Sequence, residues 1–168
     1  GKVVRESGHE WVRSVTSKVE WNVRRFLVRL CCGRLPCAAV QKERKLRDSA
    51  LCPECGDEDE DVDHMFACTA SGVSGIERAL GGLQAGFQEW LKDASQDGAN
   101  AQVALWLVPF QVMRPSVLVS GMWPQAVLER FSESERVRLK KMASNVVKDM
   151  VTWYEMWAKR RFSVAADR

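Results

Sequence analysis

The pattern of apolar and polar positions predicts two helices in the first fifty residues. Between residues 8 and 32, apolar side chains recur at spacings of three and four, which predicts one amphipathic helix. The apolar stripe of this helix comprises Trp11, Val12, Val15, Val19, Val23, Phe26, Leu27 and Leu30. Gly33 ends it, and Pro36 begins a second, strongly basic helix over residues 37–47. The two helices lead into a cysteine-rich segment with almost no linker.

The centre of the chain predicts a third helix followed by irregular structure. Residues 71–94 have helical spacing with glycine interruptions. The inner face of this helix consists of Ile76, Leu80, Leu83, Phe87, Trp90 and Leu91. The polar segment at residues 95–100 predicts a loop, and residues 101–108 form an apolar run too short to distinguish a buried helix from a strand. We expect irregular backbone around the turn-forming residues that follow, which are Pro109, Pro115, Gly121 and Pro124.

The last segment predicts one long helix. Ser132 and Glu135 form an S-x-x-E capping box, from which the helix runs to Phe162. Its stripe is expected to consist of Val137, Met142, Val146, Val147, Met150, Tyr154 and Trp157. No strand pattern is strong, so the sequence predicts a mostly α fold, an irregular helical domain. We expect a helical region over residues 1–95 that contains the cysteine-rich module, and a C-terminal helical extension over residues 96–168 that packs on it.

Charge is distributed unevenly along the 168 residues. The whole chain has 25 Lys and Arg against 22 Asp and Glu. Residues 1–50 hold twelve basic and five acidic side chains, whereas residues 51–68 hold seven acidic side chains and no basic one. The basic first third favours a phosphate backbone or an acidic protein surface as a partner, and the acidic stretch repels both.

The apolar runs are short. The longest, residues 103–110, is far below the ~20 residues of a membrane helix, so we expect no membrane span. The first residues contain no signal-peptide stretch, which predicts an intracellular protein, nuclear or cytoplasmic and not secreted. In such a reducing compartment the six cysteines favour metal binding over disulfides.

Four potential metal ligands follow one another in the segment LCPECGDEDEDVDHMFAC. Their spacing is C-x2-C-x8-H-x3-C, and they are Cys52, Cys55, His64 and Cys68. Pro53 presets a tight turn between the first two, and Gly56 permits the positive φ that follows it. His64 and Cys68 are four residues apart, so one helical turn projects both from the same face.

Three thiolates and one imidazole predict a single structural Zn²⁺ in a small CCHC zinc knuckle at residues 51–69. Protein fills all four positions and leaves none for a water nucleophile, so we do not expect catalysis there. The knuckle helix is expected to dock through Val62, Met65 and Phe66, beside a solvated acidic loop at residues 57–61. The alternative is a coincidental spacing, which the well-placed proline and glycine disfavour.

Three motifs occur in a fixed order around the knuckle: G-R-L-P at residues 33–36, C-P-E-C-G at residues 52–56 and D-H-M-F-A-C at residues 63–68. The stretch from Arg25 to about Trp90 that contains them resembles the zinc-binding region near the C-terminus of non-LTR retrotransposon reverse transcriptases. The end of the chain, MVTWYEMWAKRRF, is similar to the helical tail of such polyproteins. The sequence departs from the commoner pattern at Cys37, where Thr is more usual, and after Cys68, where a Pro often follows.

The resemblance implies a zinc-stabilised nucleic-acid-binding module downstream of a polymerase. The sequence contains no paired-aspartate polymerase motif and no set of RNase H or endonuclease carboxylates. The chemistry of the family would therefore lie outside this chain.

Eight basic side chains near the knuckle form the candidate nucleic-acid surface. They are Arg24, Arg25, Arg29, Arg34, Lys42, Arg44, Lys45 and Arg47. Several cations on one side can release counterions from a phosphate backbone, although a charge run is more often a solvated helix face. For a second basic cluster near the C-terminus we expect only a role in solubility. It comprises Lys140, Lys141, Lys159, Arg160 and Arg161.

The remaining aromatic, cysteine and histidine side chains are expected to be structural. Most of the seven tryptophans lie on apolar stripes and belong in the core, while Trp21 and Trp153 lie off the stripes and are candidates for base stacking. Cys31, Cys32 and Cys37 lack ligand spacing and are expected to be small buried hydrophobes. His9 is expected at the surface.

Two functional hypotheses follow. The chain has no Ser/His/Asp set, Walker loop or dinucleotide fingerprint, so we expect neither an enzyme nor a small-molecule substrate. The first hypothesis is binding of RNA or DNA as the zinc region of a retroelement reverse transcriptase, with the choice of nucleic acid left open. The second is a structural or assembly subunit, derived from such an element, that binds protein partners through exposed apolar and Trp-bearing faces.

Overall fold

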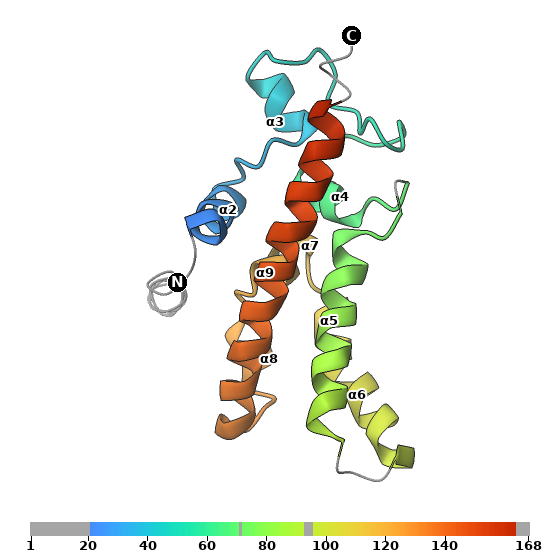
Figure 1. Cartoon of the computed structure of the whole chain (residues 1–168), viewed down its shortest axis with the longest axis vertical. Helices are drawn as coiled ribbons and strands as arrows, with labels where there is room; N and C mark the ends of the chain where they lie inside the picture. The colour runs from blue at the N-terminus through green and yellow to red at the C-terminus, as the bar shows by residue number, and fades with distance from the viewer. Residues whose placement is uncertain (1–20, 71, 93–95, 164–168) are drawn as a thin grey trace.

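The computed structural model describes residues 21–70, 72–92 and 96–163, and it is mostly helical (Figure 1). The helices are α2 (Trp21–Cys31), α3 (Ala38–Glu43), α4 (Val62–Ala67), α5 (Gly75–Trp90), α6 (Gln96–Gln111), α7 (Pro115–Ser120), α8 (Gln125–Leu128) and α9 (Glu133–Ser163). Within the described ranges, β-structure is limited to an isolated antiparallel bridge between Leu51 and Asp59. The predicted mostly α class is confirmed. None of the described helices has the length and apolar composition needed to cross a membrane.

Helices α5 and α9 run side by side along the length of the molecule (Figure 1). Helix α6 packs against α5, and α2 packs against α9. Helix α4, which carries part of the cysteine-rich segment, packs on α5 and α7. The short helix α7 also contacts α2, α5 and α9, so it lies where these helices meet.

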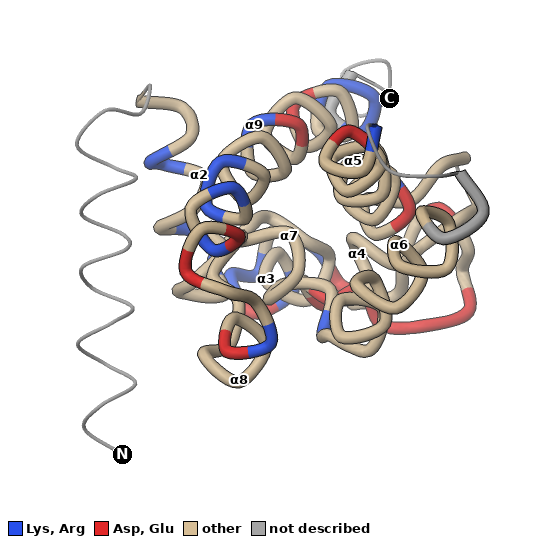
Figure 2. Tube along the Cα trace, turned by 90° about the horizontal axis from the view of Figure 1, so that it is seen from below, with Lys and Arg blue, Asp and Glu red and all other residues tan. Residues whose placement is uncertain are grey.

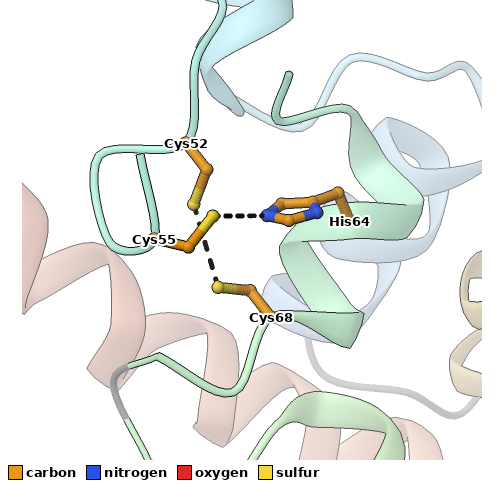
Figure 3. A group of neighbouring side chains, drawn as sticks. All are labelled: Cys52, Cys55, His64 and Cys68. Carbon is orange, nitrogen blue, oxygen red and sulfur yellow. Dashed lines mark hydrogen bonds between the residues drawn. The ribbon is translucent and has the colours of Figure 1, made fainter. Parts of the chain in front are cut away.

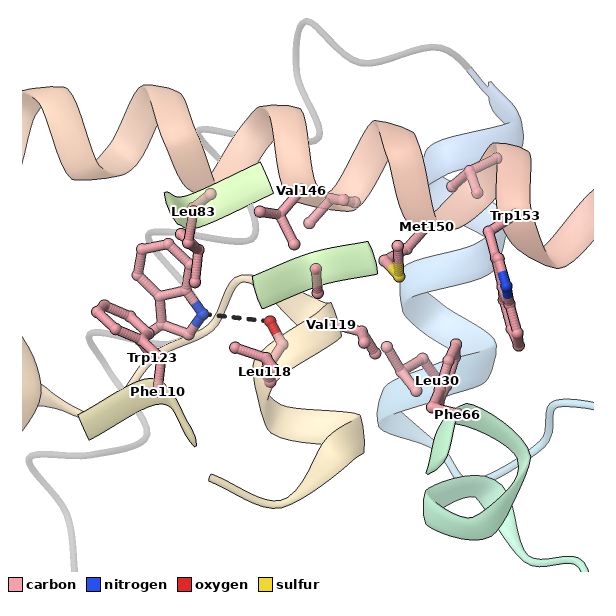
Figure 4. Packing of buried hydrophobic residues seen from close by; sticks show 14 of the residues in the cluster. Leu30, Phe66, Leu83, Phe110, Leu118, Val119, Trp123, Val146, Met150 and Trp153 are labelled. Carbon is pink, nitrogen blue, oxygen red and sulfur yellow. Dashed lines mark hydrogen bonds between the residues drawn. The ribbon is translucent and has the colours of Figure 1, made fainter. Parts of the chain in front are cut away.

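One hydrophobic cluster surrounds α7 and draws on α2, α4, α5, α6 and α9 (Figure 4). Leu118 and Val119 of α7 are almost completely buried, at 1% and 0% exposure. Trp123, which follows α7, donates a hydrogen bond from its indole Nε1 to the carbonyl oxygen of Leu118 at 3.2 Å. This bond satisfies the polar atom of a large side chain that is otherwise packed among apolar groups.

Capping boxes begin helices α5 and α9. The predicted one is confirmed: the Ser132 amide donates to Glu135 Oε2 at 2.7 Å, and the Glu135 amide donates to Ser132 Oγ at 3.4 Å. A second box, formed by Ser74 and Glu77, begins α5. Both boxes satisfy amide groups that a helix start leaves without partners.

The basic helix α3 is shorter than predicted. It ends at Glu43 instead of reaching residue 47, because the chain turns at Lys45, where φ is +57°. The Lys45 amide donates to the Lys42 carbonyl at 2.9 Å, and the Leu46 amide donates to the Gln41 carbonyl at 2.9 Å. This is a Schellman cap, in which glycine is the usual residue at the left-handed position, so a lysine there carries little sequence signal.

Helix α2 ends as predicted, next to Gly33, where φ is +60°. The Gly33 amide donates to the Leu30 carbonyl at 3.1 Å, and the Arg34 amide donates to the Arg29 carbonyl at 2.7 Å. The beginning of the predicted helix, residues 8–20, lies outside the described ranges.

The predicted irregular middle of the chain is wrong in two ways. Helix α6 begins at Gln96, inside the predicted loop, and continues through Pro109. Its buried residues Val103 and Phe110 belong to the core cluster, and this packing outweighs the polar composition of the segment. Pro115 and Pro124 do not prevent helices but begin α7 and α8, since the fixed φ of proline suits a helix start.

The predicted helix stripes are mostly buried. In α9 the clear exception is Val137, which is 65% exposed, while Leu139 is completely buried instead. In α5 the residues Leu83 and Phe87 are completely buried, and the other members of the predicted face are partly buried.

Substituting Gly75 by alanine is expected to lower the free energy of unfolding by about 1–3 kcal/mol. The added Cβ would lie 2.7 Å from Cδ1 of Phe66. The Phe66 ring cannot easily move, because it is completely buried between Phe26 and Trp153. Urea denaturation measures the effect. Gly81→Ala in the same helix is the control: its Cβ meets nothing within 4 Å, so a gain of up to about 1 kcal/mol is expected. Equal stability of the two variants would contradict this packing.

Candidate metal centre

The four predicted ligands converge at one point (Figure 3). One potential ligand atom from each of Cys52, Cys55, His64 and Cys68 lies within 4.8 Å of the other three. The sulfurs of Cys52 and Cys68 are 3.9 Å apart, and the Cys55 sulfur is 3.5 Å from Nε2 of His64. The cluster joins a hairpin, which supplies the first two residues, to α4 and its C-cap, which supply the other two.

These separations fit one tetrahedral ion. Two sulfurs that each lie about 2.3 Å from a common ion at the tetrahedral angle are roughly 3.8 Å apart, and a sulfur and a nitrogen are roughly 3.6 Å apart. The observed 3.9 Å and 3.5 Å are close to these values. The four side chains therefore lie close enough to bind one metal ion.

A tight hairpin holds the first two cysteines. The Cys52 amide donates to the Glu58 carbonyl at 2.7 Å, and the Glu60 amide donates to the Ala50 carbonyl at 2.8 Å. Within the loop that these bonds close, the Gly56 amide donates to the Cys52 carbonyl at 2.8 Å, and φ of Gly56 is +75°. The predicted turn with a positive φ at this glycine is confirmed.

The hairpin makes the two thiols electrostatically different. Hydrogen bonds from the backbone amides of Asp57 and Glu58 stabilise the Cys55 thiolate and lower its pKa to about 7. Burial has the opposite effect on Cys52 and raises its pKa to about 12. A bound cation deprotonates a coordinating thiol, so Cys55 offers a ready anionic ligand whereas Cys52 depends on the ion for ionisation.

The backbone and ring of His64 are both fixed. Its amide donates to Oδ1 of Asp61, the N-cap of α4, at 2.7 Å. Its ring Nδ1 lies 3.0 Å from Oε2 of Glu58. With the Nδ1 proton donated to this carboxylate, Nε2 presents its lone pair to the cluster, as in many metal-ligating histidines.

Glu60 departs from the prediction of a solvated acidic loop. It is 1% exposed, and its Oε2 accepts hydrogen bonds from the Ala38 amide at 2.7 Å and from Nη1 of Arg161 at 2.6 Å. Its Oε1 lies 3.6 Å from the sulfur of Cys52. A buried carboxylate requires such partners, because burial of an unpaired charge is costly.

Arg161 likewise departs from the expected role in solubility. Its side chain is 10% exposed, and its guanidinium lies over the ring of Trp157, 4.4 Å from the centroid. Its Nη2 is 4.0 Å from the sulfur of Cys52. The end of α9 therefore places a positive charge beside both the buried carboxylate and the cluster, a pairing that sequence analysis missed.

Asp63 fastens α4 to the start of α7. Its carboxylate accepts hydrogen bonds from the Ser116 amide at 2.8 Å and from the guanidinium of Arg114. Burial disfavours ionisation of Asp63, but the bonds to Ser116 and Arg114 outweigh it and hold the pKa below its usual value. Together with the buried Met65 and Phe66, this contact docks the knuckle helix on the core, as predicted for its apolar side.

The candidate nucleic-acid residues lie on α2, where Figure 2 shows several Lys and Arg, and in and around α3. Exposed members of the set are Arg24, Arg25, Arg34, Lys42, Arg44 and Lys45. Arg29 and Arg47 are half-buried, and Arg34 lies 3.5 Å from Glu43 in a surface ion pair. Solvent can therefore reach most of the predicted surface.

Two other expectations need correction. Trp153 is 6% exposed and stacks with Trp157, so it offers no open face to a base, whereas Trp21 is 69% exposed. Cys31 and Cys32 are exposed instead of buried, because they lie where α2 ends. Cys37 is buried, as predicted. His9 lies outside the described residues.

The fold and the cluster define a class: a mostly helical protein with a Cys3His cluster able to bind a metal ion. Comparisons with protein-family models, curated proteins and solved structures found no match.

Proposed function

We propose that the cluster binds one Zn²⁺ as a structural ion. Three thiolates and an imidazole are soft and borderline ligands, a donor set that favours Zn²⁺ over Mg²⁺ or Ca²⁺. Four protein ligands complete a tetrahedron and leave no position for substrate or water, so this site is non-catalytic. The ion would join the hairpin to α4.

We further propose that the chain binds RNA or DNA, as the zinc-binding region of a non-LTR retrotransposon reverse transcriptase does. The observation that carries this proposal is the position of Glu60 between the cluster and α3. Its carboxylate accepts a hydrogen bond from the Ala38 amide, and its backbone carbonyl accepts one from the Ala39 amide at 3.0 Å. Glu60 thus caps the start of α3, where the N-cap residue Cys37 makes no side-chain bond.

This connection gives the metal a role in binding. An ion that fixes the hairpin also fixes Glu60, and hence the start of the basic segment that contains Lys42, Arg44 and Lys45. These exposed cations, together with the exposed arginines of α2, are suited to a phosphate backbone.

The test is a salt titration of binding to single-stranded RNA, single-stranded DNA and duplex DNA, measured by fluorescence anisotropy on protein with one zinc per chain. Binding that weakens steeply with salt is expected for at least one of the three, because phosphate contacts release counterions. The nucleic acid with the highest affinity identifies the preferred class. Absence of binding near physiological salt would overturn the proposal.

A fourfold charge reversal in the proposed surface is expected to weaken binding and flatten its salt dependence. The substitutions are Arg24→Glu, Arg25→Glu, Arg44→Glu and Lys45→Glu. Removing one cation that pairs with a phosphate lowers the log–log slope by roughly 0.7–0.9, so the four substitutions should lower the slope by up to about 3.6.

A matched control reverses the same number of exposed cations elsewhere. Its substitutions are Arg130→Glu, Lys140→Glu, Lys141→Glu and Lys148→Glu. The total change in charge is the same in both variants. A smaller decrease of the salt-dependence slope in the control would therefore show that binding depends on this surface and not only on net charge. Equal slopes in the two variants would remove the support for this surface.

A further inference from the structure

A groove of about 480 Å³ lies between the start of α5 and the last turns of α9, apart from the proposed nucleic-acid surface. The residues that line it are Val73, Arg78, Trp153, Met156, Lys159 and Arg160. Val73 and Met156 are large apolar side chains with 69% and 45% exposure. Two exposed apolar side chains therefore lie beside three cationic side chains in this groove.

The floor of the groove is rigid. Trp153 lies between Phe66, at a centroid distance of 5.4 Å, and Trp157, at 6.4 Å. Its indole Nε1 donates a hydrogen bond to the Val73 carbonyl at 3.3 Å, which holds the segment before α5 in place. Phe66 belongs to α4, between His64 and Cys68, so the same helix supports both the groove and the metal cluster.

The groove is positively charged. Arg78, Lys159 and Arg160 line it, and a carboxylate oxygen of Asp149 lies 3.9 Å from the guanidinium of Arg78. In the part of the chain that the structure describes, the buried Nε of Arg78 has no hydrogen-bond acceptor. Such a surface favours a negatively charged ligand.

We propose that this groove binds an acidic segment of a protein partner that presents apolar side chains. Val73 and Met156 suit leucine-like anchors, and flanking carboxylates of the partner would pair with Arg78 and Lys159. Nucleic acid fits the groove less well, because base stacking needs an open aromatic face and Trp153 is 6% exposed.

The probe for this proposal is a fluorescein-labelled helical peptide of about 16 residues, with leucines at i, i+3, i+4 and i+7 and glutamates at most other positions. Fluorescence anisotropy with the full-length zinc-loaded chain should show binding that weakens with salt. Two control peptides, one with lysine for glutamate and one with serine for leucine, should not bind. Equal binding of the lysine peptide would overturn the proposal.

Met156→Glu is expected to weaken binding of the glutamate peptide at least tenfold. It places a negative charge, the same sign as that of the peptide, in the apolar part of the groove. The matched control is Val137→Glu, which adds the same charge at an exposed apolar position near the other end of α9. Val137→Glu should bind the peptide as the wild type does. Equal affinities of the two variants would place the peptide elsewhere and overturn the proposal.

Two further measurements test whether this groove and the nucleic-acid surface are distinct binding sites. The fourfold charge reversal on α2 and around α3 should leave peptide affinity within a few-fold of wild type, while Met156→Glu should leave the salt slope for nucleic acid unchanged. If single-stranded RNA displaces the peptide and loses affinity in Met156→Glu, then the groove is a nucleic-acid site and the protein-partner proposal fails.

Discussion

Substituting His64 by alanine, or Cys55 by serine, is expected to release the metal and to lower the free energy of unfolding by several kcal/mol. Structural zinc contributes on the order of 10 kcal/mol in small domains that have little other core. This chain has an extensive apolar core of its own, so we expect the loss to be a part of that value. Both residues are partly exposed, so their truncation alone creates no large cavity.

The measurement combines zinc content per chain, determined by elemental analysis, with urea denaturation. Cys32→Ser is the matched control, because it makes the same change at an exposed cysteine outside the cluster. It should retain one zinc and stay within about 0.5 kcal/mol of wild type. Full zinc retention in both His64→Ala and Cys55→Ser would refute the proposed metal centre.

The loss of stability should extend beyond the hairpin to the start of α3. Without the ion, Glu60 is held less firmly, and with it the amides of Ala38 and Ala39 at the start of α3. Hydrogen exchange should therefore accelerate at these two amides, whereas the core helix α7 should keep its protection.

The cluster is predictable because the information that specifies it is local. All four ligands lie within residues 52–68, and a tight hairpin with Gly56 and one turn of helix from His64 to Cys68 bring them together. Proline, glycine and ligand spacing are strong short-range signals. The capping box at Ser132 is specified in the same way, by two residues three positions apart.

Glu60 shows why the rest of the site could not be predicted. It stands in a run of acidic residues, and such runs are usually solvated. Its burial depends on Ala38, 22 positions before it, and on Arg161, 101 positions after it. No periodicity encodes such pairs, since they form only when α3 and α9 pack beside the hairpin.

Contacts between distant segments also account for the other differences from the predicted structure. Helix α6 begins within a polar segment because its apolar residues pack on α5, which single-sequence propensity does not register. Trp153 lies off the predicted apolar stripe of α9, but Phe66 and Val73 cover it from neighbouring elements. In each case a contact between distant segments decides the burial of the residue.

Arg161→Met is expected to lower the free energy of unfolding by about 3–5 kcal/mol, the cost of removing one partner from a buried ion pair. The arginine is 10% exposed, and its carboxylate partner Glu60 is 1% exposed. Methionine is expected to retain apolar contact with Trp157, so packing should change little. The decrease in the free energy of unfolding should therefore come mainly from loss of the positive charge. Without the guanidinium, the buried Glu60 carboxylate would lose its cationic partner.

Urea denaturation of the zinc-loaded variant measures this loss. Lys159→Met makes the same kind of substitution at an exposed cation two residues away, and it should change stability by no more than about 0.5 kcal/mol. Adding Glu60→Gln to Arg161→Met should recover part of the loss, because the double variant no longer buries an unpaired charge. If Arg161→Met is as stable as Lys159→Met, the ion pair between α9 and the hairpin does not stabilise the fold. A large loss that Glu60→Gln partly reverses instead shows that this buried charge pair holds the end of α9 to the cysteine-rich hairpin.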